Sequence, residues 1–236
     1  MEILIIGLVG YFTAWIGFFL GSVSTVVMKK SGSRFLGSMM GFTAGLLIAF
    51  ICFEMLPGAL VNLGLYTGIT VLLLGVILSA WLEGHTNSLT HWHKAGMLLI
   101  IGISVHNIPE GMALGSMLRA STAAGISLAV MIAIHSFPAA LAIALPLRQA
   151  GTKISKLVLF SFALALPMGV GASVGALFSG ISSIFMDACV SFSGGVMLYI
   201  TCGEILPESK EIWRGRMPAL GAMVGFAVGV WLTYRL

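Results

Sequence analysis

The sequence predicts an all-α membrane protein in which eight transmembrane helices form a 3+2+3 inverted-repeat bundle. Three observations support this fold class: a very apolar composition, eight apolar stretches joined by short polar ones, and internal repeats. Of the 236 residues, 58% are hydrophobic and 8% are charged, and the mean hydropathy is +1.07. Because a soluble domain carries about 25% charged residues, this chain has too little polar surface to fold in water.

Eight stretches are long enough to cross the hydrocarbon region of a bilayer, which takes about 20 apolar residues per helix. The connections between them are short and leave no room for a soluble domain. We therefore expect residues 1–236 to form a single transmembrane domain. The stretches are Ile3–Met28, Phe35–Leu60, Leu65–Leu82, Ala95–Leu118, Thr122–Leu147, Lys156–Ser179, Ser183–Leu206 and Met217–Tyr234.

The positive charges predict the orientation of the chain in the cytoplasmic membrane. If the N-terminus lies outside, ten of the twelve lysines and arginines fall in cytoplasmic loops, and only Arg119 and Arg235 remain outside. Lysine and arginine favour the cytoplasmic side of short loops. Both termini are therefore expected to be extracytoplasmic.

The loop Glu83–Lys94 would then face the cytoplasm. It contains His85, His91 and His93, which could take up a metal ion released inward. The alternative is that this loop is only a solvated connector.

Two internal repeats suggest the 3+2+3 order, an arrangement that transporters often use to build a site at the interface of inverted repeats. Spans two and seven share a pattern at an offset of 150 residues, and the five crossings between them would point the two copies in opposite directions. In this pattern Phe42, Gly45, Cys52, Glu54, Leu56 and Pro57 of span two correspond to Phe192, Gly195, Cys202, Glu204, Leu206 and Pro207 of span seven. Spans four and five match through His106, Pro109, Ala113, Leu118 and Arg119 against His135, Pro138, Ala142, Leu147 and Arg148.

The fourth span contains the stretch His-Asn-Ile-Pro-Glu-Gly at residues 106–111. On a helix His106, Asn107 and Glu110 share one face, and His135 lies near the middle of the next span. An ionisable side chain at the bilayer centre costs about 2.5–3.5 kcal/mol on insertion scales, which indicates a function or a local partner. Two imidazoles and a carboxylate suit a divalent transition metal. The alternative is a buried Glu–His pair that only fixes helix packing.

Further acids lie toward the ends of two spans. Glu54 is about two turns from the outer end of span two, and Glu204 and Glu208 lie near the inner end of span seven. These carboxylates could concentrate cations on either side of the central site. The alternative is that they reach lipid headgroups or helix partners at the interface.

His-Asn-X-Pro-Glu-Gly in the fourth of eight spans, followed by His-X-X-Pro in the fifth, is similar to the ZIP (Zrt/Irt-like protein) family of divalent metal transporters. The resemblance extends over essentially the whole chain and includes Gly-Glu-Ile-Leu-Pro-Glu at the end of span seven. It implies transport by alternating access, in which the central helices move against the repeats. It also implies a metal site between spans four and five, formed by His106, Asn107, Glu110 and His135.

The chain departs from this family at three positions. Family members often hold two metals bridged by acids, but Ser136 and Ala139 stand where the family often has Asn or Asp and Glu, and Leu166 stands where a Glu commonly precedes a proline. The resemblance therefore implies a single metal ion on the two histidines and the glutamate, helped by Asn107, Ser136 or water.

We expect a divalent-metal transporter that moves zinc, or else iron, manganese, cadmium or cobalt, without a prosthetic group. ATP drive is not expected because the chain has no Gly-X-X-X-X-Gly-Lys-Ser/Thr loop. The expected partners are the lipid bilayer and the metal ion; the separate basic loops do not suit nucleic acid, and a homodimer is left open. One alternative is a membrane metal-binding sensor or transport-inactive relative. An intramembrane zinc hydrolase with Glu110 as general base is disfavoured, because such enzymes usually carry His-Glu-X-X-His, so no enzymatic activity is expected.

Overall fold

The computed structural model describes residues 2–28, 32–84, 91–178 and 183–235, with their side chains except those of residues 91–99, 149 and 183. All regular secondary structure in these ranges is helical. The α-helices are α1 (Glu2–Met28), α2 (Ser33–Phe50), α3 (Leu56–Leu63), α4 (Leu65–Gly84), α5 (His91–Ala120), α6 (Thr122–Gln149), α7 (Ile154–Leu177), α8 (Ser183–Tyr199), α9 (Leu206–Ile212) and α10 (Met217–Thr233). Two π-helical segments, η1 (Ile51–Met55) and η2 (Ile200–Ile205), complete them.

Within the described residues, helices make up nearly all of each of the eight apolar stretches, so the expectation of an all-helical membrane fold is confirmed. Such helices satisfy their backbone N–H and C=O groups internally, as lipid requires. The helix α10 is a shorter apolar helix. Six helical stretches of the described residues are long and apolar enough to cross a bilayer: Glu2–Met28, Ser33–Leu63, Leu65–Gly84, Thr122–Arg148, Ile154–Leu177 and Ile184–Ile212.

Two of the expected spans are interrupted by π-helix, which we did not expect from the sequence. Segment η1 joins α2 to α3, and η2 joins α8 to α9; each ends just before a Leu-Pro pair. Pro57 and Pro207 lack an N–H, so the carbonyl four residues before each has no usual helical partner. The wider π turn absorbs this irregularity. Glu54 and Glu204 consequently both lie in π-helix.

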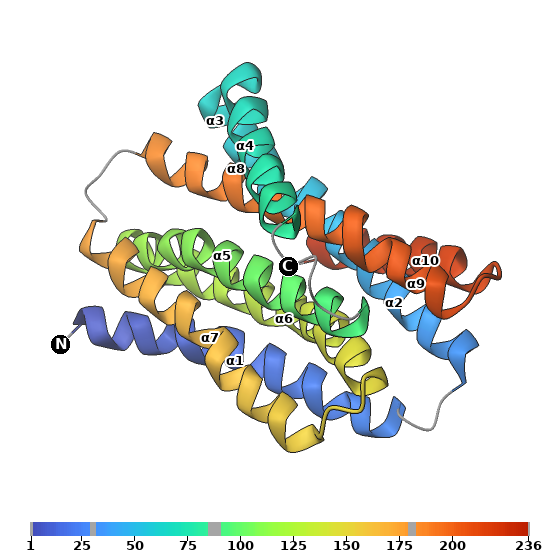
Figure 1. The fold of residues 1–236 in the computed structure, drawn as a ribbon. Coiled ribbons are helices and arrows are strands. Elements are labelled where there is room, and N and C mark those ends of the chain that lie inside the picture. The colour runs from blue at the N-terminus through green and yellow to red at the C-terminus, as the bar shows by residue number, and fades with distance from the viewer. Residues whose placement is uncertain (1, 29–31, 85–90, 179–182, 236) are drawn as a thin grey trace.

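The helices α5 and α6 lie between two groups of helices (Figure 1). On one side, α1 packs against α6 and α7, and α7 packs against α5. On the other side, α2 contacts α6 and α8 contacts α5, while α10 packs along α2 and α4 packs along α8. The middle of the α5–α6 pair is therefore enclosed by other helices.

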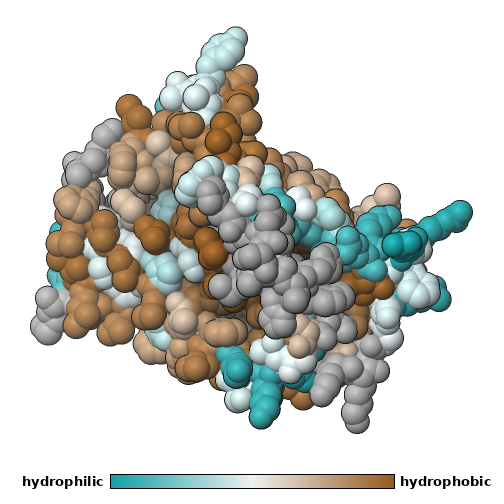
Figure 2. Space-filling view, viewed as in Figure 1, coloured by the Kyte–Doolittle hydropathy of each residue, from teal (hydrophilic) through white to brown (hydrophobic). Residues whose placement is uncertain are grey.

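The connections between helices gather at two ends of this bundle. In Figure 1 the start of α1, the turn between α5 and α6, the end of α7 and the start of α8 lie toward the left, whereas the end of α1, the start of α2 and the connections after α6 and α9 lie toward the right. Arg34, Arg148 and Lys210 belong to helix ends at those right-hand connections. Figure 2 shows strongly hydrophilic surface toward the right and lower edges and apolar surface over much of the rest. A charged end beside a broad apolar surface suits a protein embedded in lipid.

Glycines permit close helix contacts at two points near the centre. At Gly17 of α1, a Cβ atom would lie 2.5 Å from Cβ of Ser136 and 2.6 Å from the carbonyl oxygen of Ala133, both on α6. At Gly111 of α5, it would collide with the carbonyl oxygen of Met168 on α7. Small residues let membrane helices approach closely. The final glycine of the His-Asn-Ile-Pro-Glu-Gly stretch is therefore explained by packing.

Candidate metal site

The site begins on α5, which continues through Pro109 rather than ending there. His106 and Glu110 lie one helical turn apart, on the same face as expected. Nε2 of His106 is 3.2 Å from Oε2 of Glu110. The helix therefore presents an imidazole and a carboxylate side by side at the middle of the bundle.

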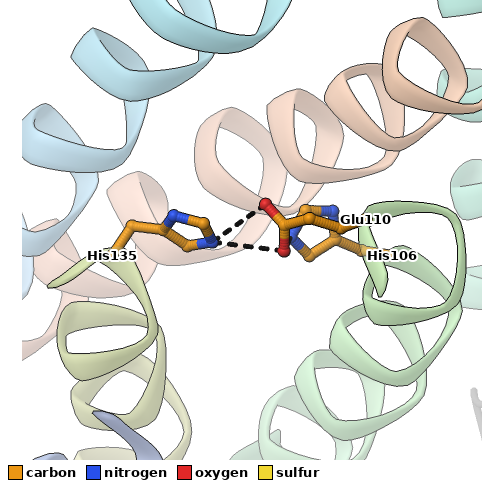
Figure 3. Close-up of side chains that lie close together, drawn as sticks. All are labelled: His106, Glu110 and His135. Carbon is orange, nitrogen blue, oxygen red and sulfur yellow. Dashed lines mark hydrogen bonds and ion pairs between the residues drawn. The ribbon is translucent and has the colours of Figure 1, made fainter. Parts of the chain in front are cut away.

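The helix α6 supplies the second histidine. Ser121 alone separates α5 from α6, and its Oγ caps α6 by accepting a hydrogen bond from the N–H of Ala124. Across this reversal of the chain, Nε2 of His135 lies 3.1 Å from Oε1 and 3.3 Å from Oε2 of Glu110. Figure 3 shows the carboxylate of Glu110 between the two imidazole rings.

The cluster is shielded from solvent. His106 is 2% exposed, Glu110 5% and His135 6%. One ligand atom from each of the three lies within 4.8 Å of the others, which makes this the one such group among the described residues. The ring of Phe50 lies 5.9 Å from the ring of His135. A carboxylate in such surroundings is stable only with partners close by.

A cavity of about 10 Å³ borders the cluster. This is about the space that one water-sized sphere requires. Its walls come from α1, α2, α5, α6, α8 and η2, and they are mostly apolar. They comprise Phe18, Leu47, Ile103, His106, Asn107, His135, Ser136, Ala139, Met197, Ile200, Thr201 and Ile205. The space beside the two histidines therefore suits a water molecule or a small ion.

The helix α8 contributes a residue that the sequence analysis missed. Ser193 is fully buried, its Oγ contacts Nδ1 of His106, and it lies 3.2 Å from the carbonyl oxygen of His106. Eighty-seven residues separate the two in sequence, and serine is an ordinary small packing residue in membrane helices. No pattern in the sequence could have paired them.

Asn107 is buried beside the cluster but its amide nitrogen is directed to α7. Nδ2 donates a hydrogen bond to the carbonyl oxygen of Leu164 at 2.9 Å. Since an amide nitrogen is a donor, only the side-chain oxygen of Asn107 could be a metal ligand. Asn107 also borders the cavity.

Three positions bear on the number of metal ions. Ser136 is buried and, like Ala139, borders the cavity next to His135. Leu166 on α7 is 56% exposed. Neither Ala139 nor Leu166 offers a ligand atom, so the carboxylate of Glu110 is the one acid in the cluster.

The other acids predicted from the sequence do not join this group of ligands within the described residues. Glu54 is exposed on η1 and lies within electrostatic reach of His135. Glu204 is half-buried on η2 and lines a second cavity together with Glu83. Glu208 is buried on α9, with 6% exposed. Its burial fits contact with helix partners better than contact with lipid headgroups.

The connection between α4 and α5 is shorter than the expected loop Glu83–Lys94. The helix α4 extends to Gly84 and α5 begins at His91, so the backbone of His91 and His93 belongs to α5. Placing these two histidines in a loop was wrong, because no glycine or proline between residues 91 and 95 breaks the helix. His85 lies outside the described residues.

Together, the fold and the site define a class of protein: a multi-pass helical membrane protein whose buried polar centre has the ligand types of a divalent transition-metal site. Comparison with known families agrees with this class. The family model described as ZIP Zinc transporter matches residues 82–233. The chain belongs to this family of metal transporters, whose members are not enzymes.

Individual relatives extend the match to most of the chain. The zinc transporter GufA of Myxococcus xanthus is 33% identical over 177 residues, which cover 70% of this chain and 69% of GufA. The zinc transporter ZupT of Escherichia coli O7:K1 is 30% identical over 231 residues, which cover 89% of both chains. ZupT of Escherichia coli K12 has the same identity and coverage.

Proposed function

We propose that this protein carries zinc into the cell across the cytoplasmic membrane, and that one ion at a time binds between α5 and α6. His106, Glu110 and His135 are its proposed ligands. The names of the relatives support zinc as the substrate. The ligand types support it too, because imidazole suits zinc and iron better than it suits hard cations such as magnesium.

The observation that carries this proposal is the position of the Glu110 carboxylate between two imidazole nitrogens. The N–O distances are 3.1–3.3 Å. Two ligands bound to one tetrahedral zinc at 2.0–2.1 Å are separated by about 3.3 Å, from the tetrahedral angle. The carboxylate therefore lies at the spacing of two zinc ligands from each imidazole nitrogen, and ligand atoms of all three side chains lie within 4.8 Å of one another.

Charge also favours a dication here. Glu110 contributes one negative charge, and two neutral histidines contribute none, so a bound dication leaves a net charge of only +1. The fourth ligand would be the side-chain oxygen of Asn107, the hydroxyl of Ser136 or water, all of which the adjoining cavity admits. Without acids at Ala139 and Leu166, a second metal ion lacks its bridging ligands.

We propose alternating access within one transmembrane domain, residues 1–236, built as a 3+2+3 inverted repeat. Several packing contacts support the repeat because they occur in pairs: α1 with α6 and α7 with α5, α2 with α10 and α8 with α4, α2 with α6 and α8 with α5. Exchanging the first three spans for the last three, and α5 for α6, converts each contact into its counterpart. The π-helical segments η1 and η2 occupy corresponding positions in the two copies.

The proposed path passes Glu54 on the outer side and Glu204 and Glu208 on the inner side. Both termini would be extracytoplasmic, because the end of the bundle rich in lysine and arginine should face the cytoplasm. The electrostatic reach between Glu54 and His135 supports the outer part of this path. The cavity beside Glu204 supports the inner part.

Zinc uptake by purified protein in vesicles tests the proposal. Wild-type vesicles should accumulate zinc, whereas His106→Ala, Glu110→Ala and His135→Ala should each abolish accumulation. Thr25→Ala is a matched control, because it removes a buried hydroxyl that donates to the carbonyl oxygen of Ser22 on α1 and borders neither the central cavity nor the cavity beside Glu204. If the alanine variants accumulate zinc as fast as wild type, the site is elsewhere.

The same vesicles separate transport from binding alone. Zinc that binds to the protein without accumulating in the lumen would identify a membrane metal-binding sensor or transport-inactive relative. Lumenal zinc reported by an enclosed fluorescent chelator distinguishes the two outcomes.

A further inference from the structure

We propose that Ser193 positions the metal ligand His106 by holding its ring proton on Nδ1, so that Nε2 presents its lone pair to the transported ion. This inference rests on the function proposed above and deepens it. Ser193 would be a positioning residue rather than a ligand, since it contacts the ring nitrogen on the side away from Glu110.

The argument is an accounting of protons. A serine hydroxyl has one proton to donate and lone pairs to accept with. Oγ of Ser193 lies 3.2 Å from the carbonyl oxygen of His106, which can only accept, and it also contacts Nδ1 of the same residue, which accepts or donates according to the tautomer. Both contacts are hydrogen bonds only when the hydroxyl gives its one proton to the carbonyl oxygen and the ring donates from Nδ1. A neutral imidazole with its proton on Nδ1 carries its lone pair on Nε2.

Nε2 is the nitrogen that faces the proposed metal. It lies 3.2 Å from Oε2 of Glu110, and both atoms are then acceptors. A cation between these two atoms removes their repulsion. The cavity that borders His106 gives a dication space beside them.

The second histidine shows the same organisation. Nε2 of His135 faces Glu110, and the backbone of Met131, one turn earlier on α6, lies within reach of its ring. Metal-binding histidines generally donate their other N–H to an oxygen, which fixes the tautomer and the ring orientation. His106 obtains this support from a different helix, and His135 obtains it from its own.

Zinc affinity of the detergent-solubilised protein tests the role of Ser193. Ser193→Ala should weaken equilibrium zinc binding by about 10- to 100-fold, the usual loss when a partner of a metal ligand is removed. Ser193→Thr keeps the hydroxyl and should retain more of the affinity. Ser191→Ala is the control: Ser191 is equally buried on α8, but its hydroxyl bonds to the carbonyl oxygen of Gly68 on α4, so zinc affinity should stay unchanged.

The tautomer provides a readout that a general packing defect would not change. NMR of wild-type protein with ¹⁵N-labelled histidine and bound zinc should show the His106 signal with Nδ1 protonated and Nε2 bound to metal, assigned by its loss in His106→Ala. A metal-bound Nδ1, or a proton on Nε2, overturns the inference even if Ser193→Ala does not fold. Wild-type protein that binds no zinc overturns the proposed function itself. Tight zinc binding by wild type that Ser193→Ala leaves unchanged overturns only the role of Ser193.

Discussion

The carboxylate of Glu110 lies 3.1 Å from Nε2 of His135, although 25 residues and a reversal of the chain separate them. The contact exists because the two helices are joined through Ser121 alone and pack along one another. A carboxylate buried this deeply would be costly without such partners. Two imidazoles that point toward it from different helices complete a metal-ligand set with it, and a bound cation would offset its charge.

Replacing Glu110 with glutamine should weaken zinc binding by more than about 100-fold, beyond the loss typical of residues that touch only the ligands. The variant keeps the size of the side chain and a hydrogen-bonding oxygen, but it removes the one acid of the cluster. Equilibrium binding of radioactive zinc to the purified protein measures the effect.

Glu2→Gln provides the control for this change. Glu2 is an exposed carboxylate that pairs with Arg119 at 3.1 Å, far along α5 from the cluster. Its loss should leave zinc affinity unchanged, because exposed ion pairs contribute little. Equal weakening in both variants would mean that the effect of Glu110→Gln is not specific to the site.

Much of this arrangement could be predicted from the sequence. The helical membrane fold follows from the composition and from the length of the apolar stretches. His106 and Glu110 follow from their spacing of four residues, because local periodicity determines which side chains share a helix face. Mid-span ionisable residues are rare, so His135 could be associated with them before any contact was known.

The remaining features depend on contacts between distant segments. Ser193 reaches His106 only because α8 packs against α5, and no local pattern reports that packing. The amide nitrogen of Asn107 bonds to the Leu164 carbonyl, a partner that sequence spacing cannot identify. The π-helical segments were also missed, since a proline indicates an irregular helix but not which wider or tighter turn absorbs it.

Zinc uptake should decline as the pH falls, because imidazole binds zinc only in its neutral form and protons therefore compete with the metal for its histidine ligands. The direction is therefore weaker uptake at lower pH. Vesicles held at equal pH on both sides, with free zinc buffered, measure this without a proton gradient. A flat profile would contradict competition at these ligands.

Gly17→Ala should lower the free energy of unfolding by about 1–3 kcal/mol, the usual cost of forcing extra atoms into a packed contact. The added methyl would meet Ser136 and the backbone of Ala133 on α6 at 2.5–2.6 Å. Because Ser136 adjoins His135, zinc affinity should fall as well. Gly58→Ala on α3 is the control, since no atom lies within 4 Å of its added Cβ. Denaturation in detergent and zinc binding measure both effects, and equal stability of the two variants would refute this packing argument.

Glu204→Gln should slow zinc uptake by up to about tenfold at low salt while leaving equilibrium zinc affinity unchanged. Glu204 lines a cavity with Glu83 on the proposed inner path, where its charge would concentrate cations rather than bind the ion at the centre. Screening shortens the reach of such a charge from about 10 Å at 0.1 M salt to about 3 Å at 1 M. The difference in uptake rate between Glu204→Gln and wild type should therefore shrink in high salt.

The control is Glu211→Gln, which removes an exposed carboxylate on α9 and should behave as wild type at every salt concentration. Uptake rates at several salt concentrations, with zinc binding measured in parallel, decide between the two roles. A loss of affinity as large as the loss of rate would make Glu204 part of the binding site instead of the path.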